Sequence, residues 1–245
     1  MEYFNKSFSQ LADLESFDPQ SFMPDGKVSK EICGFILTLA LIYTDIKKLI
    51  IFYEAIFESK PKGEFKLQKD WGEYTGLARF LDRHNISILH ELFNFIKKEK
   101  NLLEDEFIKS LVQALNKDAR LAWQALIDAS LEKLSSNKFS KDLMFIRNKI
   151  TFHYDSKIVL KGFEHFIEHG QITKKAFISR GSNLAQSRFY FADAAAENYL
   201  ISLSNPDDLE DFFKQVRDNI KKINVSIWYI VINFIQKRGT AFRKV

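Results

Sequence analysis

The sequence predicts an all-α fold, an antiparallel bundle of long helices, on three observations. Nine glycines and four prolines make up about 5% of the 245 residues, against roughly 12% in average proteins, so residues that favour turns are scarce. Apolar residues recur at helical spacing over two long segments. No internal repeat and no Pro/Gly/Ser-rich linker divides the chain. We therefore expect residues 1–245 to form one helical domain.

The two longest helices are predicted from apolar stripes whose spacings alternate between three and four. One stripe runs from Ile32 to Ile56 and the other from Leu209 to Phe234. The second is preceded by Asn205, a suitable N-cap, and Pro206, which suits the first helical position. Its predicted end is at Gly239, a typical C-terminal stop.

Further helices are predicted between these two. The pattern favours a helix over Tyr74–Lys98 and then Glu104–Leu115 and Asp118–Leu134, which can be one bent helix or two. Ser140 can cap a shorter helix, and Asp155 or Ser156 can cap another that Gly170 ends. Residues 172–191 contain Gly181-Ser-Asn183 and can form a small β-hairpin or an irregular excursion.

Cysteine use and hydropathy indicate a cytoplasmic protein. Cys33 is the only cysteine and lies in an apolar stretch, so it is expected to be buried and inert. The N-terminal residues do not have the pattern of a secretory signal. The longest apolar stretches are far shorter than the roughly 20 residues of a membrane span, so we expect no membrane association.

Positive charge is concentrated in one segment of a chain whose formal net charge is +4. Residues 132–188 contain 11 basic and five acidic side chains, whereas the rest of the chain carries a small net negative charge. Such a segment can be a solvated face, or it can attract a polyanion such as RNA by releasing counterions.

Within this segment, helical spacing places Arg147 beside apolar Leu143, Met144 and Ile150. A guanidinium on an apolar face is normally paired with a carboxylate or directed at an anion. Asn148 follows the arginine directly and His153 comes six positions after it.

The sequence Arg147-Asn148-Lys-Ile-Thr-Phe-His153 resembles the motif of the HEPN families, in which an arginine and a polar residue precede a histidine by four to six residues. The resemblance covers mainly residues 143–155, within a motif-bearing core of about 104–170. It implies a helical bundle, a homodimer that brings two motifs into one cleft, and metal-independent ribonuclease activity without a cofactor. It also implies a role in a toxin or antiphage system, with an antitoxin or other regulatory protein as a possible partner.

The residues of the motif suit RNA cleavage by the 2′-hydroxyl group. His153 can act as acid or base near neutral pH, and Arg147 can bind the phosphate through two hydrogen bonds. Asn148 can hold His153 or the phosphate by hydrogen bonds. The nearby Lys141, Lys149 and Tyr154 are expected to contact the RNA substrate.

Helix geometry adds a condition. Six residues turn through about 600° of an ideal helix, so one continuous helix would place Arg147 and His153 on different faces. The helix is therefore expected to end near Thr151, so that His153 can turn back. Two other interpretations stay open: a buried network that fixes this turn in a catalytically inactive RNA-binding or protein-interaction module, or an unrelated bundle.

Two other histidine patterns are weaker. His165-Phe-Ile-Glu168-His169 matches the two-histidine motif of the inverted zinc peptidases, but no convincing third ligand follows. A solvated helix end is the simpler interpretation, and no metal site is predicted. His84 falls on an apolar stripe and is expected to be a core residue.

Overall fold

The computed structural model describes residues 15–63, 69–131, 156–169, 178, 187–203, 209–239 and 241–244. The fold is all-α, as predicted. Its α-helices are α2 (Lys30–Glu58), α3 (Lys69–Lys98), α4 (Glu106–Gln113), α5 (Lys117–Ser130), α7 (Ser156–His169), α8 (Tyr190–Leu203) and α9 (Leu209–Lys237). Two 3-10 helices, η1 (Pro19–Phe22) and η2 (Lys100–Glu104), and two short strands, β1 (Glu15–Ser16) and β2 (Arg243–Lys244), complete the described elements.

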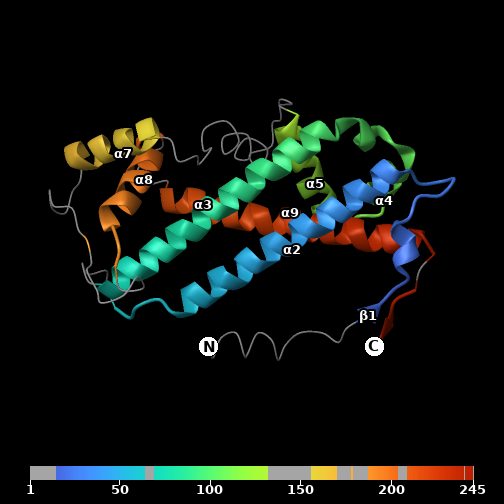
Figure 1. Ribbon diagram of the computed structural model, residues 1–245, viewed down its shortest axis with the longest axis horizontal. Coiled ribbons are helices and arrows are strands. Elements are labelled where there is room, and N and C mark those ends of the chain that lie inside the picture. Colours follow the sequence, from blue (N-terminus) through green and yellow to red (C-terminus); the bar gives the residue numbers. More distant parts are fainter. Residues whose placement is uncertain are drawn as a thin grey trace.

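Three long helices, α2, α3 and α9, form the body of the bundle (Figure 1). The short helices α4 and α5 lie toward the end of the bundle where α3 ends, and α7 and α8 lie where α3 begins. Antiparallel β1 and β2 pair Glu15 with Lys244 and Ser16 with Arg243, which brings the two ends of the described chain together.

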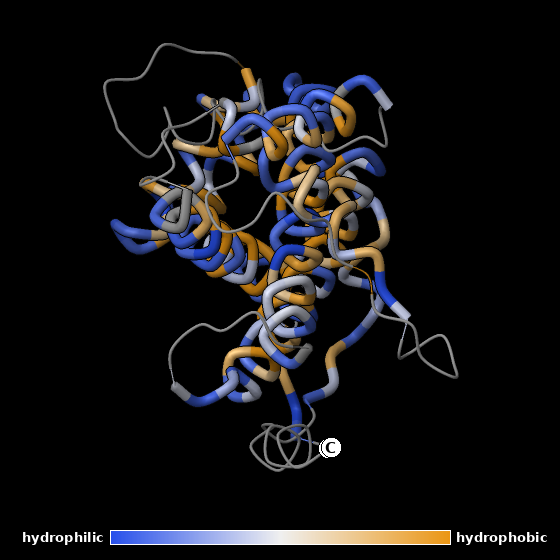
Figure 2. Tube along the Cα trace, turned by 90° about the vertical axis from the view of Figure 1, so that its left-hand side faces the viewer, coloured by the Kyte–Doolittle hydropathy of each residue, from blue (hydrophilic) through white to orange (hydrophobic). Residues whose placement is uncertain are grey.

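The core lies where the three long helices face one another, and Figure 2 shows this from the α7–α8 end. Ile36 and Leu39 of α2, Leu89 of α3 and Ile227 of α9 have no or almost no exposed surface. Trp123 of α5 covers the same core and is 1% exposed. Both predicted long stripes therefore form helices with one face buried, as amphipathic helices require.

Polar side chains set the starts of several helices. Ser29 Oγ accepts a hydrogen bond from the Ile32 backbone N–H and caps α2. Asn116 Oδ1 accepts one from the Ala119 N–H at 2.9 Å and caps α5. Because Asn116 is a cap, it separates α4 from α5. The two alternatives that the sequence allowed, one bent helix or two, are thus resolved as two.

The buried face of α3 corrects the prediction for His84, which is exposed rather than a core residue. Its ring contacts Phe80, with ring centroids 4.3 Å apart. The buried positions are shifted toward Asn85, Ile86 and Leu89. The apolar pattern of this helix fits two neighbouring stripes, and packing against α2 and α9 selects the one without His84.

Helix α8 was not predicted. Its N-terminal half is rich in alanine, the best helix former, and Ala195 and Ala196 are buried. Most of the segment for which a hairpin was considered, and the helix predicted after Ser140, lie outside the described residues. Helix α7 begins at Ser156, where a cap was predicted, and extends to His169.

Within the described parts of the chain, no helix combines the length and apolar character that crossing a membrane requires.

Arg238, just beyond the end of α9, binds residues 21–25, the segment that precedes α2. Its Nε and Nη2 donate to the carbonyls of Ser21 at 3.0 Å and Met23 at 2.8 Å, and Nη1 pairs with the Asp25 carboxylate. The same carboxylate accepts hydrogen bonds from the backbone N–H groups of Lys27 and Val28. These hydrogen bonds, led by that from Lys27, lower the pKa of Asp25 below its usual 3.8.

We expect the contacts between Arg238 and residues 21–25 to weaken in acid. The pKa of Asp25 in the folded protein lies below its ordinary value. The ionised carboxylate therefore stabilises the folded state fully above about pH 4, and this contribution is lost as the pH falls through the folded pKa. The exchange of the amides around Val28, measured relative to an unfolded peptide at the same pH, should therefore accelerate below pH 4 in the wild type. The same acceleration in Asp25→Asn would show that another group is responsible.

Candidate functional site

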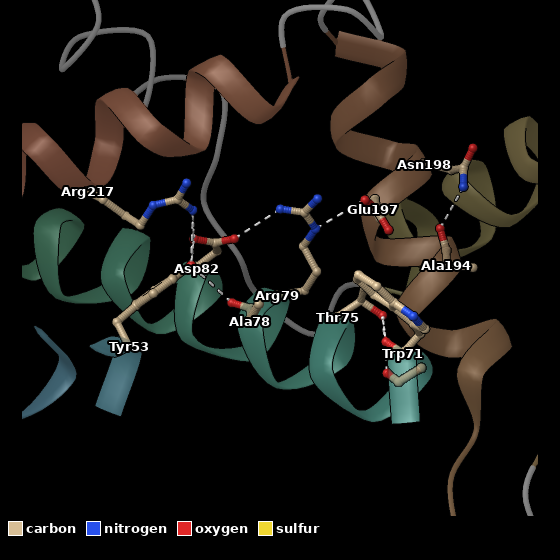
Figure 3. A network of polar contacts seen from close by, with 11 residues as sticks. Tyr53, Trp71, Thr75, Ala78, Arg79, Asp82, Ala194, Glu197, Asn198 and Arg217 are labelled. Carbon is tan, nitrogen blue, oxygen red and sulfur yellow. Dashed lines mark hydrogen bonds and ion pairs between the residues drawn. The ribbon is translucent and has the colours of Figure 1, made fainter. Parts of the chain in front are cut away.

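A largely buried network of charged and hydroxyl groups joins the helices α2, α3, α8 and α9 (Figure 3). Its hub is Asp82 of α3, whose surface is completely buried. The Asp82 carboxylate accepts hydrogen bonds from Arg79 Nη1 at 3.2 Å and from Arg217 Nη1 of α9 at 3.3 Å. It also accepts one from the hydroxyl of Tyr53 on α2.

The network extends to α8 through Arg79. The Nε of this arginine donates to Glu197 Oε1 at 3.1 Å, and its guanidinium lies 4.6 Å from the centre of the Phe213 ring. Arg79 therefore lies between the carboxylates of Asp82 and Glu197. Since an unpaired buried charge is costly, these contacts are what allow ionised groups to remain in the core.

Burial and charge change the acidity of two groups in this network. Burial is the largest effect on Asp82 and raises its pKa, against the opposing effects of the Tyr53 hydroxyl and the two arginines. Burial, followed by the negative charge of Asp82, raises the pKa of Tyr53. Tyr53 therefore stays protonated at neutral pH and is a hydrogen-bond donor rather than a base.

The network opens onto a groove between α2 and α9 with a volume of about 580 Å³. Its α9 wall carries Lys214, Arg217 and Lys221, whereas Glu54 and Glu58 line the α2 side. The complete lining is Ile50, Tyr53, Glu54, Phe57, Glu58, Asn85, Lys214, Arg217, Asp218, Ile220 and Lys221. Groups of both charges and a buried amide, Asn85, can hold a polar ligand, but none of these lining residues is a histidine.

A second polar cluster attaches α8 to α3. Arg188 donates to Glu73 at 2.8 Å and to Asp193 at 2.8 Å, and Arg83 pairs with Asp193 at 3.4 Å. The Arg188 guanidinium occupies the space where a Cβ on Gly76 would lie, with Nη2 at 1.2 Å. A side chain at position 76 would therefore force the Arg188 guanidinium out of its present place.

The residues predicted to act on RNA lie outside the described part of the chain. These are Arg147, Asn148 and His153 as the catalytic group, and Lys141, Lys149 and Tyr154 as RNA contacts. They fall between the end of α5 at Ser130 and the start of α7 at Ser156. Their roles therefore stay predictions from the sequence.

The buried network was not predicted from the sequence, although a signal exists. Asp82 lies four residues before buried Ile86, and Arg217 lies four after buried Phe213 and three before buried Ile220, so helical spacing places each charge on an apolar face. The same reasoning that selected Arg147 applies to these positions. It identifies buried charges without saying whether they have a structural or a catalytic role.

Two other kinds of reactive site can be assessed in the residues that the structure describes: the thiol of Cys33 and clusters of metal ligands. Cys33 is 3% exposed, and burial raises the pKa of its thiol, so it is a poor nucleophile, as expected. Across the same residues, no three or more His, Cys, Asp or Glu side chains gather as ligands for a metal ion.

Comparison with known proteins adds no relative. No protein-family model, no curated protein and no solved structure matches this chain.

Proposed function

We propose that this protein is a metal-independent endoribonuclease in which Arg147 and His153 are the catalytic pair. The observation that carries the proposal is the sequence Arg147-Asn148-x4-His153 in the most basic segment of the chain. No described histidine lines the groove beside Asp82, and the pKa of Tyr53 there is too high for a general base. The groove carries the carboxylates of Glu54, Glu58 and Asp218 but no histidine, so the motif, which contains His153, is the better candidate for acid–base chemistry near neutral pH.

Two features of the described residues support the proposal. The fold is an all-α bundle, the architecture that the HEPN resemblance implies. The described helix α7 covers Ser156–His169, where the sequence predicts a helix capped at Asp155 or Ser156 that follows the motif. The motif needs a helix break before His153, because a continuous helix would direct Arg147 and His153 to different faces.

In the proposed reaction, a ribose 2′-hydroxyl attacks the adjacent phosphorus and the bond to the 5′-oxygen breaks. His153 removes the 2′ proton or gives a proton to the leaving oxygen, and a second His153 in a homodimer can supply the other function. Arg147 stabilises the extra negative charge on the phosphate. Asn148 orients these groups, and Lys141, Lys149 and Tyr154 hold the RNA. The products are a 2′,3′-cyclic phosphate and a free 5′-hydroxyl.

The test is RNA cleavage by the purified chain in excess EDTA, with single-stranded and structured substrates. We expect the wild type to leave 2′,3′-cyclic phosphate ends. His153→Ala removes an acid–base group and Arg147→Ala removes a charge-stabilising group, so each should lower the rate by at least about 100-fold. His84→Ala is the matched control, because His84 is exposed and lies outside the motif. It should cleave like the wild type.

Equal cleavage by all four proteins would indicate a contaminating nuclease and would contradict the proposal. Absence of cleavage by a folded wild type on every RNA would also contradict it. RNA binding that is retained in that case would identify the chain as an inactive RNA-binding module.

A further inference from the structure

The groove between α2 and α9 is a candidate ligand site that the proposed ribonuclease reaction does not use. Its volume of about 580 Å³ lies within the range of small-molecule sites. Its lining includes Asn85 of α3, which is only 4% exposed. No hydrogen bond joins the Asn85 side chain to another residue in the described part of the chain. A buried amide without a partner is costly, so this group suits a ligand that offers both a donor and an acceptor.

Helices α2 and α9 run antiparallel beside this groove. Arg217 Nη1, near the start of α9, donates to the hydroxyl of Tyr53, near the end of α2, at 3.2 Å (Figure 3). Arg238, beyond the end of α9, binds the segment that precedes α2. Tyr53 and Arg217 therefore lie at about the same level. Glu58 comes five residues after Tyr53. Lys221 comes four after Arg217, so Glu58 and Lys221 lie toward opposite ends of the groove.

The two ends of the groove differ in the sign of their charge. Glu58 lies at one end and Lys221 at the other, and neither forms an ion pair within the described ranges of the chain. The other charged lining residues form two sets without net charge: Glu54 with Arg217 in the middle of the groove, and Lys214 with Asp218 one turn apart on α9. The groove therefore complements a ligand with a positive and a negative end.

The end at Glu58 favours a cation for two further reasons. Glu58 is the last residue of α2, and the C-terminal end of a helix carries a partial negative charge. Phe57 beside it is 53% exposed, so an ammonium group can lie against the face of its ring.

We propose that the groove binds a short peptide of about three residues with free termini. Its ammonium group pairs with Glu58 and its carboxylate with Lys221. One of its peptide groups exchanges hydrogen bonds with the Asn85 amide, which has the same donor and acceptor. Ile50 and Ile220, which line the groove toward Lys221, contact its C-terminal side chain.

Helix geometry sets the length of this peptide. At 1.5 Å per residue, Glu58 and Lys221 are about 13–14 Å apart along the helix axes. Packed helix axes are about 8–10 Å apart, so the diagonal between the two residues is about 16 Å. An extended tripeptide is about 10 Å long, and a charge-assisted hydrogen bond adds about 3 Å at each end. A dipeptide is shorter by about 3.5 Å and should pair with only one end.

The experiment is calorimetric titration of the full chain with the tripeptide Ala-Ala-Leu at pH 7 and low salt. The comparison peptides are its N-acetyl derivative, its C-terminal amide and the dipeptide Ala-Leu. We expect one Ala-Ala-Leu per chain. Each comparison peptide should bind about three- to tenfold more weakly, the loss expected for one partly exposed charge-assisted hydrogen bond.

Substitutions connect each terminus of the peptide to its partner. Glu58→Gln should remove the preference for the free over the acetylated peptide, and Lys221→Gln the preference for the free acid over the amide. Asn85→Ala should weaken binding of Ala-Ala-Leu about two- to tenfold. Lys98→Gln is the matched control, because Lys98 is 81% exposed and lies outside the groove. It should bind like the wild type.

Equal binding of the free and blocked tripeptides would overturn the proposal, as would absence of binding by the folded wild type. Retention of both preferences in Glu58→Gln and Lys221→Gln would place the peptide elsewhere and overturn it as well. Both residues are exposed, so these two variants should fold like the wild type. Because binding is the readout, the result does not depend on RNA cleavage.

Discussion

Replacing Asp82 with alanine should lower the free energy of unfolding by about 3–5 kcal/mol, the usual cost of removing one partner of a buried ion pair. The carboxylate is completely buried and accepts hydrogen bonds from Arg79, Arg217 and Tyr53. Without it, two largely buried guanidinium groups lose a counter-ion that water cannot replace. Urea unfolding of wild type and Asp82→Ala at pH 7 measures the difference.

Asp45→Ala is the matched control for this prediction. Asp45 also pairs with a basic residue three positions away, Lys48 at 3.2 Å, but 46% of its side chain is exposed. Its loss should cost no more than about 1 kcal/mol, because water screens exposed pairs. Equal effects of the two substitutions would show that the Asp82 network contributes no more than a surface ion pair.

A double substitution separates lost charge from lost packing. If an unpaired Arg217 causes most of the instability of Asp82→Ala, then adding Arg217→Met should restore part of the lost stability. If the cause is instead the cavity left by the aspartate, the second substitution should add to the loss.

Replacing Gly162 with alanine should lower the free energy of unfolding by about 1–3 kcal/mol, the usual cost of overpacking. A Cβ at this position in α7 would lie 2.0 Å from the carbonyl oxygen of Ala195 and 2.8 Å from the backbone nitrogen of Tyr199, both in α8. Since these are backbone atoms, they cannot move aside without separating the two helices. Thermal unfolding and the hydrogen exchange of α7 measure the effect.

Gly34→Ala is the control and should have the opposite sign. Gly34 lies inside α2, and nothing lies within 4 Å of the place where its Cβ would be. Alanine there should stabilise the protein by about 0.5–1 kcal/mol, because glycine is the weaker helix former. Stabilisation by both substitutions would contradict the close contact between α7 and α8.

The candidate sites differ in how far the sequence predicts them, because they differ in how their residues are arranged along the chain. Arg147, Asn148 and His153 are neighbours in sequence, so their pattern can be recognised without a fold. The groups around Asp82 come from four helices, α2, α3, α8 and α9. No local spacing relates Tyr53 to Arg217, so only tertiary structure could bring them together.

The sequence by itself determined the class of the fold and the positions of its longest helices. The stripes from Ile32 and from Leu209 predict α2 and α9 because a helix with one buried face repeats its apolar residues every three to four positions. The start of α7 at Ser156 was predicted for a local reason as well, since capping involves only residues within one turn.

Tertiary structure decided which of several similar faces is buried and which polar groups meet. The stripe of α3 permits His84 or Asn85 to face inward, and packing against α2 and α9 buries Asn85. Helix α8 has little amphipathic pattern of its own, and its contacts with α3 and α7 depend on Arg188, Glu197 and the missing side chain of Gly162. These features depend on complementary shape and charge between segments that are distant in sequence. The apolar periodicity of one segment does not indicate which other segment it packs against.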